Sequence, residues 1–258
     1  MIDPGRVDVL GSRISAVNAD EALALIRKRL RDGHGGYVCF TNVHTAVAGR
    51  QDASLRAVTN SSFLSVADGK PVYWLARSRG SVGHVPGPDF MALAVERCRS
   101  QRHFFYGSTP EVLNRLATRL RDDFPGVNIC GLFSPPFRAL TDDEKQQHYK
   151  LIRDARPEFI WVGLGAPKQE LWMAEAFEAL RPSVLLGVGA AFDFHAHVVN
   201  RAPGAMRAMG LEWLFRLMSQ PRRLWRRYLI TNTLFLVYLV RDVVSGVRRR
   251  DAAGPGSR

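Results

Sequence analysis

Hydrophobic and polar positions divide the first 200 residues into short apolar runs separated by longer amphipathic segments. In segments such as 110–124 and 167–180, apolar residues recur every three or four positions, which is the spacing of one helix face. The apolar runs are 37–41, 62–66, 103–107, 127–133, 158–165 and 183–189. Continuous apolar strands that alternate with helices predict a Rossmann-like α/β fold, a mainly parallel sheet with flanking helices.

The N-terminal segment has a different pattern. Residues 6–18 read as two short strands around Gly11 and Ser12, which predicts a hairpin. Asn18, with Glu21 three residues later, has the spacing of a capping box, so a helix is expected to begin there.

From Gly204 onward the pattern becomes helical, aromatic and rich in arginine. Its longest nearly apolar stretch, 228–240, is shorter than the roughly 20 residues that a spanning helix needs. Arginine beside Trp and Leu is typical of a helix in the membrane interface. We therefore expect two parts: a Rossmann-like core at 1–203 and a helical, membrane-docking appendage at 204–258.

Charge is concentrated in the same C-terminal part. The chain of 258 residues has a net charge of +12, and residues 201–258 hold 12 Arg and three acids, which leaves +9 there. A basic tail on a nearly neutral body indicates an anionic partner: nucleic acid, a phosphate-rich ligand or an anionic membrane surface. A solvated helix face would also account for the charge.

The cysteines and the N-terminus bear on the compartment. Cys39, Cys98 and Cys130 lie far apart and form no CxxC pair, which favours reduced thiols. No N-terminal stretch has the order of a signal peptide. The expected location is the cytoplasm.

Ligands of parallel α/β sheets bind beyond the carboxyl ends of the strands. The residues that follow the apolar runs are therefore the candidates: 42–44, 68–69, 107–109, 165–169 and 189–193.

Asp68 has the most distinctive place among these candidates, because it stands between two apolar runs at a strand end. A turn or a helix cap would explain it, and Gly69 would then provide a tight bend into the next helix. A carboxylate partly desolvated by Phe63, Tyr73 and Trp74 would also serve as a general base for a hydroxyl nucleophile.

Several cofactor motifs are missing. "GLGAPKQE" and "GVGAAFD" do not complete GxGxxG, and no GxxxxGK[ST] loop occurs. Asp193, His195 and His197 lack a well-spaced further metal ligand, so we expect neither a metal nor a cofactor. In "GSTPEVL", Ser108 or Thr109 would cap a helix whose N–H groups suit a diphosphate, although capping alone explains these residues equally well.

Taken together and in order, the strand-end motifs resemble the WecG/TagA/CpsF family of bacterial glycosyltransferases. The resemblance runs from about Val7 to Tyr228. Its carriers are "TN" (41–42), "ADG" (67–69), "VPGPDF" (85–90), "FFYGSTPEVL" (104–113), "WVGLGAPKQE" (161–170), "GVGAAFDF" (187–194), "NRAP" (200–203) and "GLEWLFRLMSQPRRLWRRY" (210–228).

The resemblance implies an inverting, metal-independent transferase that is peripheral on the cytoplasmic face of the cell membrane. It would move a sugar from a UDP-sugar to a polyprenyl-diphosphate-linked sugar, with N-acetylmannosamine, its uronic acid or a hexose as the sugar moved. Nucleic acid is not expected as a partner.

The resemblance also assigns roles. Asp68 matches the proposed base and Gln169 a substrate-contacting glutamine, and Asp193 at the last strand end is expected to bind substrate. The appendage arginines thought to grip phosphates match Arg216, Arg223 and Arg226, in keeping with the planar donor geometry of arginine.

Some positions depart from the family pattern. The family often has Thr-x-Asn before the aspartate, whereas this chain has Phe40, Thr41 and Asn42; Asn42 is expected to bind substrate, and Thr41 to assist catalysis from one position away. His84 stands where an arginine usually precedes the V-x-G-x-D segment, and a substrate contact is expected from it. His197 stands where many members have glycine.

Two other function classes fit the sequence less well. A nucleotide-cofactor oxidoreductase needs a complete dinucleotide turn, which the sequence lacks. A basic nucleic-acid-binding α/β protein without catalysis would explain the charge. It would not explain Asp68, "GLGAPKQE" or the spacing of Trp225, Leu229 and Leu236.

Overall fold

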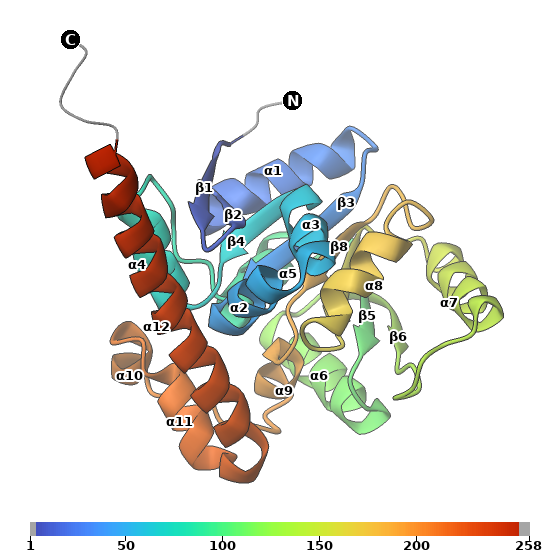
Figure 1. The fold of residues 1–258 in the computed structure, drawn as a ribbon. Helices are drawn as coiled ribbons and strands as arrows, with labels where there is room; N and C mark the ends of the chain where they lie inside the picture. The colour runs from blue at the N-terminus through green and yellow to red at the C-terminus, as the bar shows by residue number, and fades with distance from the viewer. Residues whose placement is uncertain (1–3, 253–258) are drawn as a thin grey trace.

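The computed structural model describes residues 4–252, with side chains described as far as Ser245. Its centre is a parallel six-stranded sheet in the order β4-β3-β8-β7-β5-β6 (Figure 1). The strands are β3 (Gly36–Thr41), β4 (Leu64–Ala67), β5 (Arg102–Gly107), β6 (Asn128–Phe133), β7 (Phe159–Gly163) and β8 (Val184–Gly187). The predicted Rossmann-like α/β class is confirmed, because every strand pair in this sheet is parallel.

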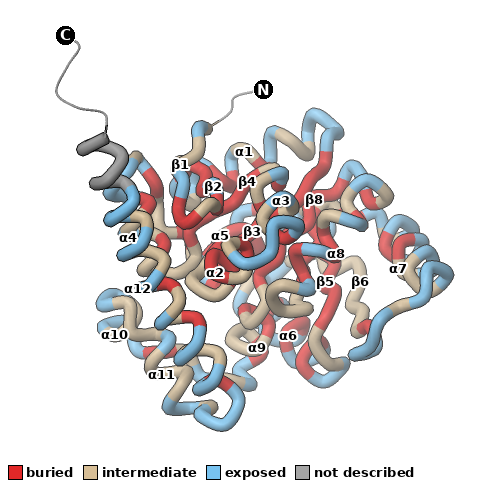
Figure 2. Tube along the Cα trace, viewed as in Figure 1, coloured by how far each residue is buried: buried red, intermediate tan, exposed pale blue. Residues whose placement is uncertain are grey.

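Both faces of the sheet are buried, which is why its strands read as continuous apolar runs (Figure 2). Phe159 and Trp161 of β7 pack on one face, and Ile160 and Val162 pack on the other. The first face is covered by α1 (Ala19–Arg31), α5 (Gly87–Arg97), α6 (Pro110–Asp123) and α9 (Ala191–His195), and the second by α7 (Asp142–Asp154) and α8 (Lys168–Ala176).

The N-terminal hairpin begins a third apolar cluster. Strands β1 (Arg6–Val9) and β2 (Ser12–Ser15) pair antiparallel, as predicted, and the capping box of Asn18 and Glu21 opens α1. The hairpin packs with helices from the β4 edge of the sheet: α2 (Val43–Gln51), α4 (Lys70–Arg77) and the neighbouring α3 (Ala53–Ser61).

The C-terminal part is helical, as expected of the appendage: α10 (Gly204–Ala208), α11 (Glu212–Ser219) and α12 (Pro221–Ala252). The long helix α12 packs along α2 (Figure 1). Phe235 is 5% exposed within the third cluster, and Arg50 forms an ion pair with Asp242 at 2.9 Å. The division at 203/204 stays a prediction, and residues 1–3 and 253–258 of its two ranges lie outside the described residues.

One expectation about α12 was wrong. By length and composition alone, Pro221–Ser245 is long and apolar enough to cross a membrane, with mean hydropathy 1.3, and 11% of its apolar window is buried in the protein. The nearly apolar stretch 228–240 is shorter than the helix that contains it, because α12 begins before Tyr228 and continues beyond Val240. Length and hydropathy do not fix orientation, so the helix is equally compatible with lying in a membrane interface.

Candidate active site

A groove of about 1460 Å³ lies at the carboxyl ends of the strands and extends to the C-terminal helices. Its walls come from the loops after β3, β4, β5, β7 and β8, and from α10, α11 and α12. The predicted site residues that line it are Asn42, Asp68, His84, Gln169, Asp193, Arg216 and Arg223. Thr41 and Arg226 are the predicted residues that the groove lining does not include.

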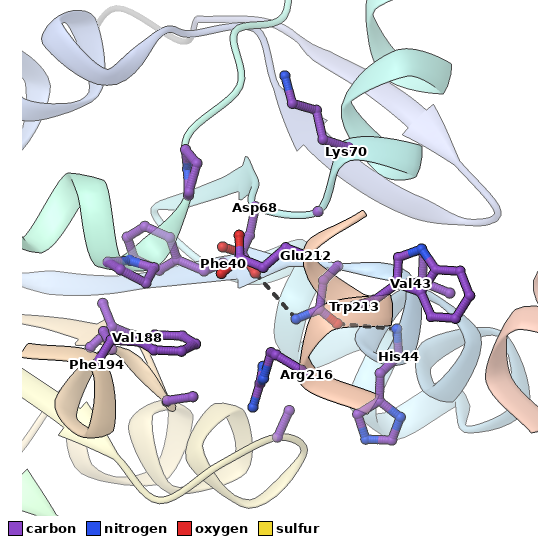
Figure 3. Close-up of a pocket in the computed structure, with 18 of the residues that line it drawn as sticks. Phe40, Val43, His44, Asp68, Lys70, Val188, Phe194, Glu212, Trp213 and Arg216 are labelled. Atoms are coloured by element: carbon purple, nitrogen blue, oxygen red, sulfur yellow. Dashed lines mark hydrogen bonds between the residues drawn. The ribbon is translucent and has the colours of Figure 1, made fainter. Parts of the chain in front are cut away.

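Asp68 is the first residue after β4, half-buried and held by hydrogen bonds to both carboxylate oxygens. Its Oδ1 accepts from the backbone N–H of Gly87 at 2.8 Å. Its Oδ2 accepts from Nδ2 of Asn42 at 3.3 Å, the dashed line at Asp68 in Figure 3. Burial raises the pKa of Asp68, and these two hydrogen bonds and then the charge of Arg216 oppose the rise. A carboxylate with a raised pKa that faces a groove has the chemistry of a general base.

Gly69 follows Asp68 and opens α4, but its backbone is ordinary, with φ of −83°. The expected tight bend is therefore not what requires glycine here. An added Cβ would come within 3.1 Å of the Asn42 Cβ, so the missing side chain lets the β4 loop approach Asn42 closely.

His84 supports the backbone of Asp68. Its Nε2 lies 2.8 Å from the carbonyl oxygen of Asp68, and a carbonyl only accepts, so Nε2 carries the proton. Burial lowers the pKa of His84, and the nearby Lys70 lowers it further, which favours the neutral ring. The ring lines the groove, and its contact with substrate stays a prediction.

Thr41 contributes to the site through its backbone. Its side chain is 2% exposed and hydrogen-bonds to the Ser65 hydroxyl at 2.8 Å, whereas Phe40 lines the groove. Successive strand residues point to opposite faces, so only one of the pair can face the ligand. The Thr41 carbonyl instead accepts the backbone N–H of Asp68 at 3.0 Å.

Gln169, at the start of α8, faces the groove with a fixed amide. Its Nε2 donates to the Gly187 carbonyl at 2.8 Å and to Oε1 of Glu170 at 3.0 Å. Since the Gly187 carbonyl cannot donate, the amide cannot flip without losing this bond. Its Oε1 is buried without a protein partner and is left to accept a hydrogen bond from a ligand O–H or N–H.

Glu170 was missed by the sequence analysis. It is 1% exposed, and burial raises its pKa. The sequence gives one signal that could have identified Glu170: it directly follows the candidate Gln169 in the first turn of a helix. Its burial depends on the packing of α8 against α3 and β3, which the local pattern does not reveal.

Arg201, near the end of the core, and arginines of the appendage form the opposite wall. Arg201, Arg207, Arg216, Arg223 and Arg227 line the groove (Figure 3 shows Arg216). The Nε atoms of Arg207, Arg216 and Arg227 are buried without a hydrogen-bond partner in the protein. Unpaired arginine donors of this kind can form charge-assisted hydrogen bonds to a phosphate group.

Arg226 does not line the groove with the other predicted arginines, and its phosphate contact stays a prediction. It is exposed and lies over the Trp225 ring at 5.2 Å, while Arg227 turns to the groove. Arg223 and Arg227 are four residues apart and both line the groove, whereas Arg226 points about 100° around the helix from Arg227.

Arg201 joins the core to the appendage. It binds Asp89 of α5 through two hydrogen bonds, at 2.5 and 2.9 Å, and reaches Glu212 of α11 at 3.5 Å. These residues also line the groove. Sequence reasoning missed this link because its members are far apart in the chain.

Asp193 lies in α9, opposite the arginines. Burial raises its pKa, and the charges of Arg223 and Arg216 oppose the rise. The nearby histidines do not converge with it: Nε2 of His195 donates to the Pro88 carbonyl at 2.9 Å, and His197 is exposed. Within the described residues, no three His, Cys, Asp or Glu side chains gather as metal ligands. The expectation of a metal-free reaction stays a prediction.

His197 has a left-handed backbone, with φ of +51°. This conformation favours glycine, which explains why a glycine suits the position in the resembling family. Near β5, Thr109 caps α6 as predicted by accepting from the Val112 N–H at 3.4 Å, and Ser108 and Thr109 both line the groove.

The sequence of the chain matches a known protein family. The model described as "Glycosyl transferase WecG/TagA/CpsF family" matches residues 7–249. The match covers the sheet, the groove and most of α12, so every residue of the site described above lies within it.

Proposed function

This chain belongs to the WecG/TagA/CpsF family of glycosyltransferases, which act in cell-surface polysaccharide synthesis, and we propose that it transfers a sugar from a UDP-sugar to a polyprenyl-diphosphate-linked sugar. The observation that carries the proposal is the half-buried Asp68 carboxylate opposite an arginine wall within one groove. A transferase of this kind needs a base for the acceptor hydroxyl and cations for diphosphates.

In the proposed reaction, Asp68 takes the proton of the acceptor hydroxyl. The acceptor oxygen forms a bond to the anomeric carbon of the donor sugar, while the bond from that carbon to the UDP oxygen breaks. Attack opposite the leaving group inverts the anomeric configuration. UDP leaves with the electron pair of the broken bond, and Arg207 and Arg216, whose Nε atoms are unpaired at the groove, stabilise its negative charge.

Asn42, His84 and Gln169 would position the reactants. Asn42 and His84 hold the carboxylate and the backbone of Asp68, and the free Gln169 Oε1 would accept a hydrogen bond from a sugar O–H or acetamido N–H. Asp193 faces two of the arginines and would bind substrate beside them. The sugar moved would be N-acetylmannosamine, its uronic acid or a hexose.

The proposed location is peripheral, on the cytoplasmic face of the cell membrane. The basic C-terminal part favours an anionic surface, and α12 exposes large apolar side chains such as Leu229, Ile230 and Val237. Flotation with anionic liposomes, beside retention on a DNA column, separates this proposal from nucleic-acid binding. DNA retention without flotation contradicts the membrane location.

The central experiment is a panel of UDP-sugars assayed against a synthetic sugar-diphospho-lipid, with EDTA present. We expect one donor to support transfer by the wild type. Asp68→Asn should lower kcat by about 10²- to 10⁴-fold, the usual contribution of a general base. The variant should keep its affinity for the UDP-sugar in calorimetry, since Asn preserves the shape of the side chain. Full activity of Asp68→Asn excludes the proposed base, and dependence on added metal contradicts the metal-free reaction.

A further inference from the structure

The groove extends away from Asp68 between α4 and α12. The groove is lined at intervals of four residues by Lys70 and Trp74 of α4, with Ser78 as its C-cap, and by Thr231, Phe235 and Leu239 of α12. This spacing places each set on a single helix face. Two helix faces therefore border one part of the groove.

Apolar side chains also line that part of the groove, beside the polar Lys70, Ser78 and Thr231. We name it the α4–α12 trough, lined by Val43, Trp74, Leu75, Phe235, Leu236 and Leu239. Phe235 is buried in the third cluster and Leu75 packs against that cluster, so both rest on the core. Trp74 and Leu236 are 50% and 62% exposed, so both present apolar surface that a ligand could cover.

The trough is continuous with the arginine wall. Along α12, Arg223, Arg227, Thr231, Phe235 and Leu239 follow at intervals of four and all line the same groove. The groove side of α12 therefore changes from cationic to apolar along the helix. The complementary ligand is an amphiphile with an anionic head and an apolar chain.

We infer that the α4–α12 trough binds the apolar chain of such an amphiphile while its diphosphate lies on Arg223 and Arg227 of α12. The inference rests on the proposed function, in which this ligand is the lipid acceptor and the chain is the part of its polyprenol next to the diphosphate. From Thr231 to Leu239 the helix rises roughly 12 Å, so the trough holds only the first part of a long chain.

The opposite face of α12 has another role in this arrangement. Ile230 and Val237 are exposed, do not line the groove, and lie on the far side of the helix from Phe235. They are available to a membrane while the trough holds the chain. Substitutions on the two faces can therefore be compared on one helix.

The test measures binding of inorganic diphosphate and of farnesyl diphosphate, a short isoprenoid diphosphate, to the purified full chain by calorimetry without detergent. The wild type should bind farnesyl diphosphate at least about tenfold more tightly, because the trough buries part of its chain. Leu236→Asp and Trp74→Ala, on the two walls, should each remove most of this gain without changing the Kd of inorganic diphosphate. Both side chains are largely exposed, so the fold should tolerate the changes.

Val237→Asp is the matched control, since it adds the same charge one residue away on the other face, and it should preserve the gain. Equal affinity for the two ligands, a gain that survives both trough variants, or no binding of either ligand overturns the inference. The UDP-sugar panel on the same preparations separates the two proposals. Transfer without a chain-dependent gain overturns the trough alone, whereas no transfer with any donor overturns the proposed function.

Discussion

Asn42 links the start of helix α2 to the carboxylate of Asp68. Its Oδ1 accepts the backbone N–H groups of His44 and Thr45 at 3.1 and 3.2 Å, and its Nδ2 donates to Oδ2 of Asp68 at 3.3 Å. Because the oxygen of the amide serves the helix cap, the amide nitrogen necessarily faces Asp68. One side chain thus stabilises the fold and lowers the pKa of the proposed base.

Serine at position 42 should separate these two roles. Ser caps helices as well as Asn, so Asn42→Ser should keep the stability close to wild type, whereas Asn42→Ala should lose about 0.5–2 kcal/mol. Both variants remove the donor to Asp68, so the pKa of its carboxyl should rise. The acid limb, which is the low-pH part of the profile where kcat/KM rises with pH, should then move to higher pH. Urea unfolding and pH–rate profiles measure the two effects. An unchanged acid limb in Asn42→Ser would show that the amide does not tune Asp68.

The acid limb itself should report a raised pKa. Burial raises the pKa of Asp68 above its ordinary 3.8, so kcat/KM should rise with pH through a value above 3.8. In this window the folded state binds the proton more tightly than the unfolded state, so ionisation of Asp68 costs stability as the pH rises. Arg216→Gln removes a charge that opposes the shift and should move the limb higher. A limb at or below 3.8 in the wild type contradicts the assignment.

The sequence predicted the sheet and the strand-end residues, because buried parallel strands have a continuous apolar pattern and the site lies beyond their carboxyl ends. Asp68, Gln169 and Asp193 could be found in this way. The buried Glu170 and the link between Arg201 and Asp89 could not, since both depend on packing between distant elements.

Gln169 should lose function when its free oxygen is removed. Gln169→Met keeps the length but not the acceptor, and kcat/KM should fall by about tenfold, the effect of one lost hydrogen bond to a ligand. Glu170→Gln retains an oxygen that accepts from the Gln169 amide, so its kcat/KM should stay near that of the wild type. Glu170→Leu removes this acceptor, so its kcat/KM should fall as in Gln169→Met. Steady-state kinetics on the active donor measure this series.

The pH profile of Glu170→Gln provides the control for the assignment of the base. Burial raises the pKa of Glu170 as well, so this carboxyl is the other candidate for an acid limb. The limb should persist in Glu170→Gln, because we assign it to Asp68. If the acid limb disappears in Glu170→Gln, the titrating group is Glu170, and Asp68 is not the base that the profile reports.

Arg226 and Arg227 offer a matched pair that tests position against charge. Arg227 lines the groove with a buried, unpaired Nε, whereas Arg226 is exposed over Trp225. Arg227→Gln should weaken binding of inorganic diphosphate by about tenfold, the loss of one charge-assisted contact, and Arg226→Gln should leave it unchanged. Both variants lose one positive charge, so their binding to anionic vesicles should fall equally. Equal losses of diphosphate binding would show that the net charge of α12, and not the direction of Arg227, attracts the ligand.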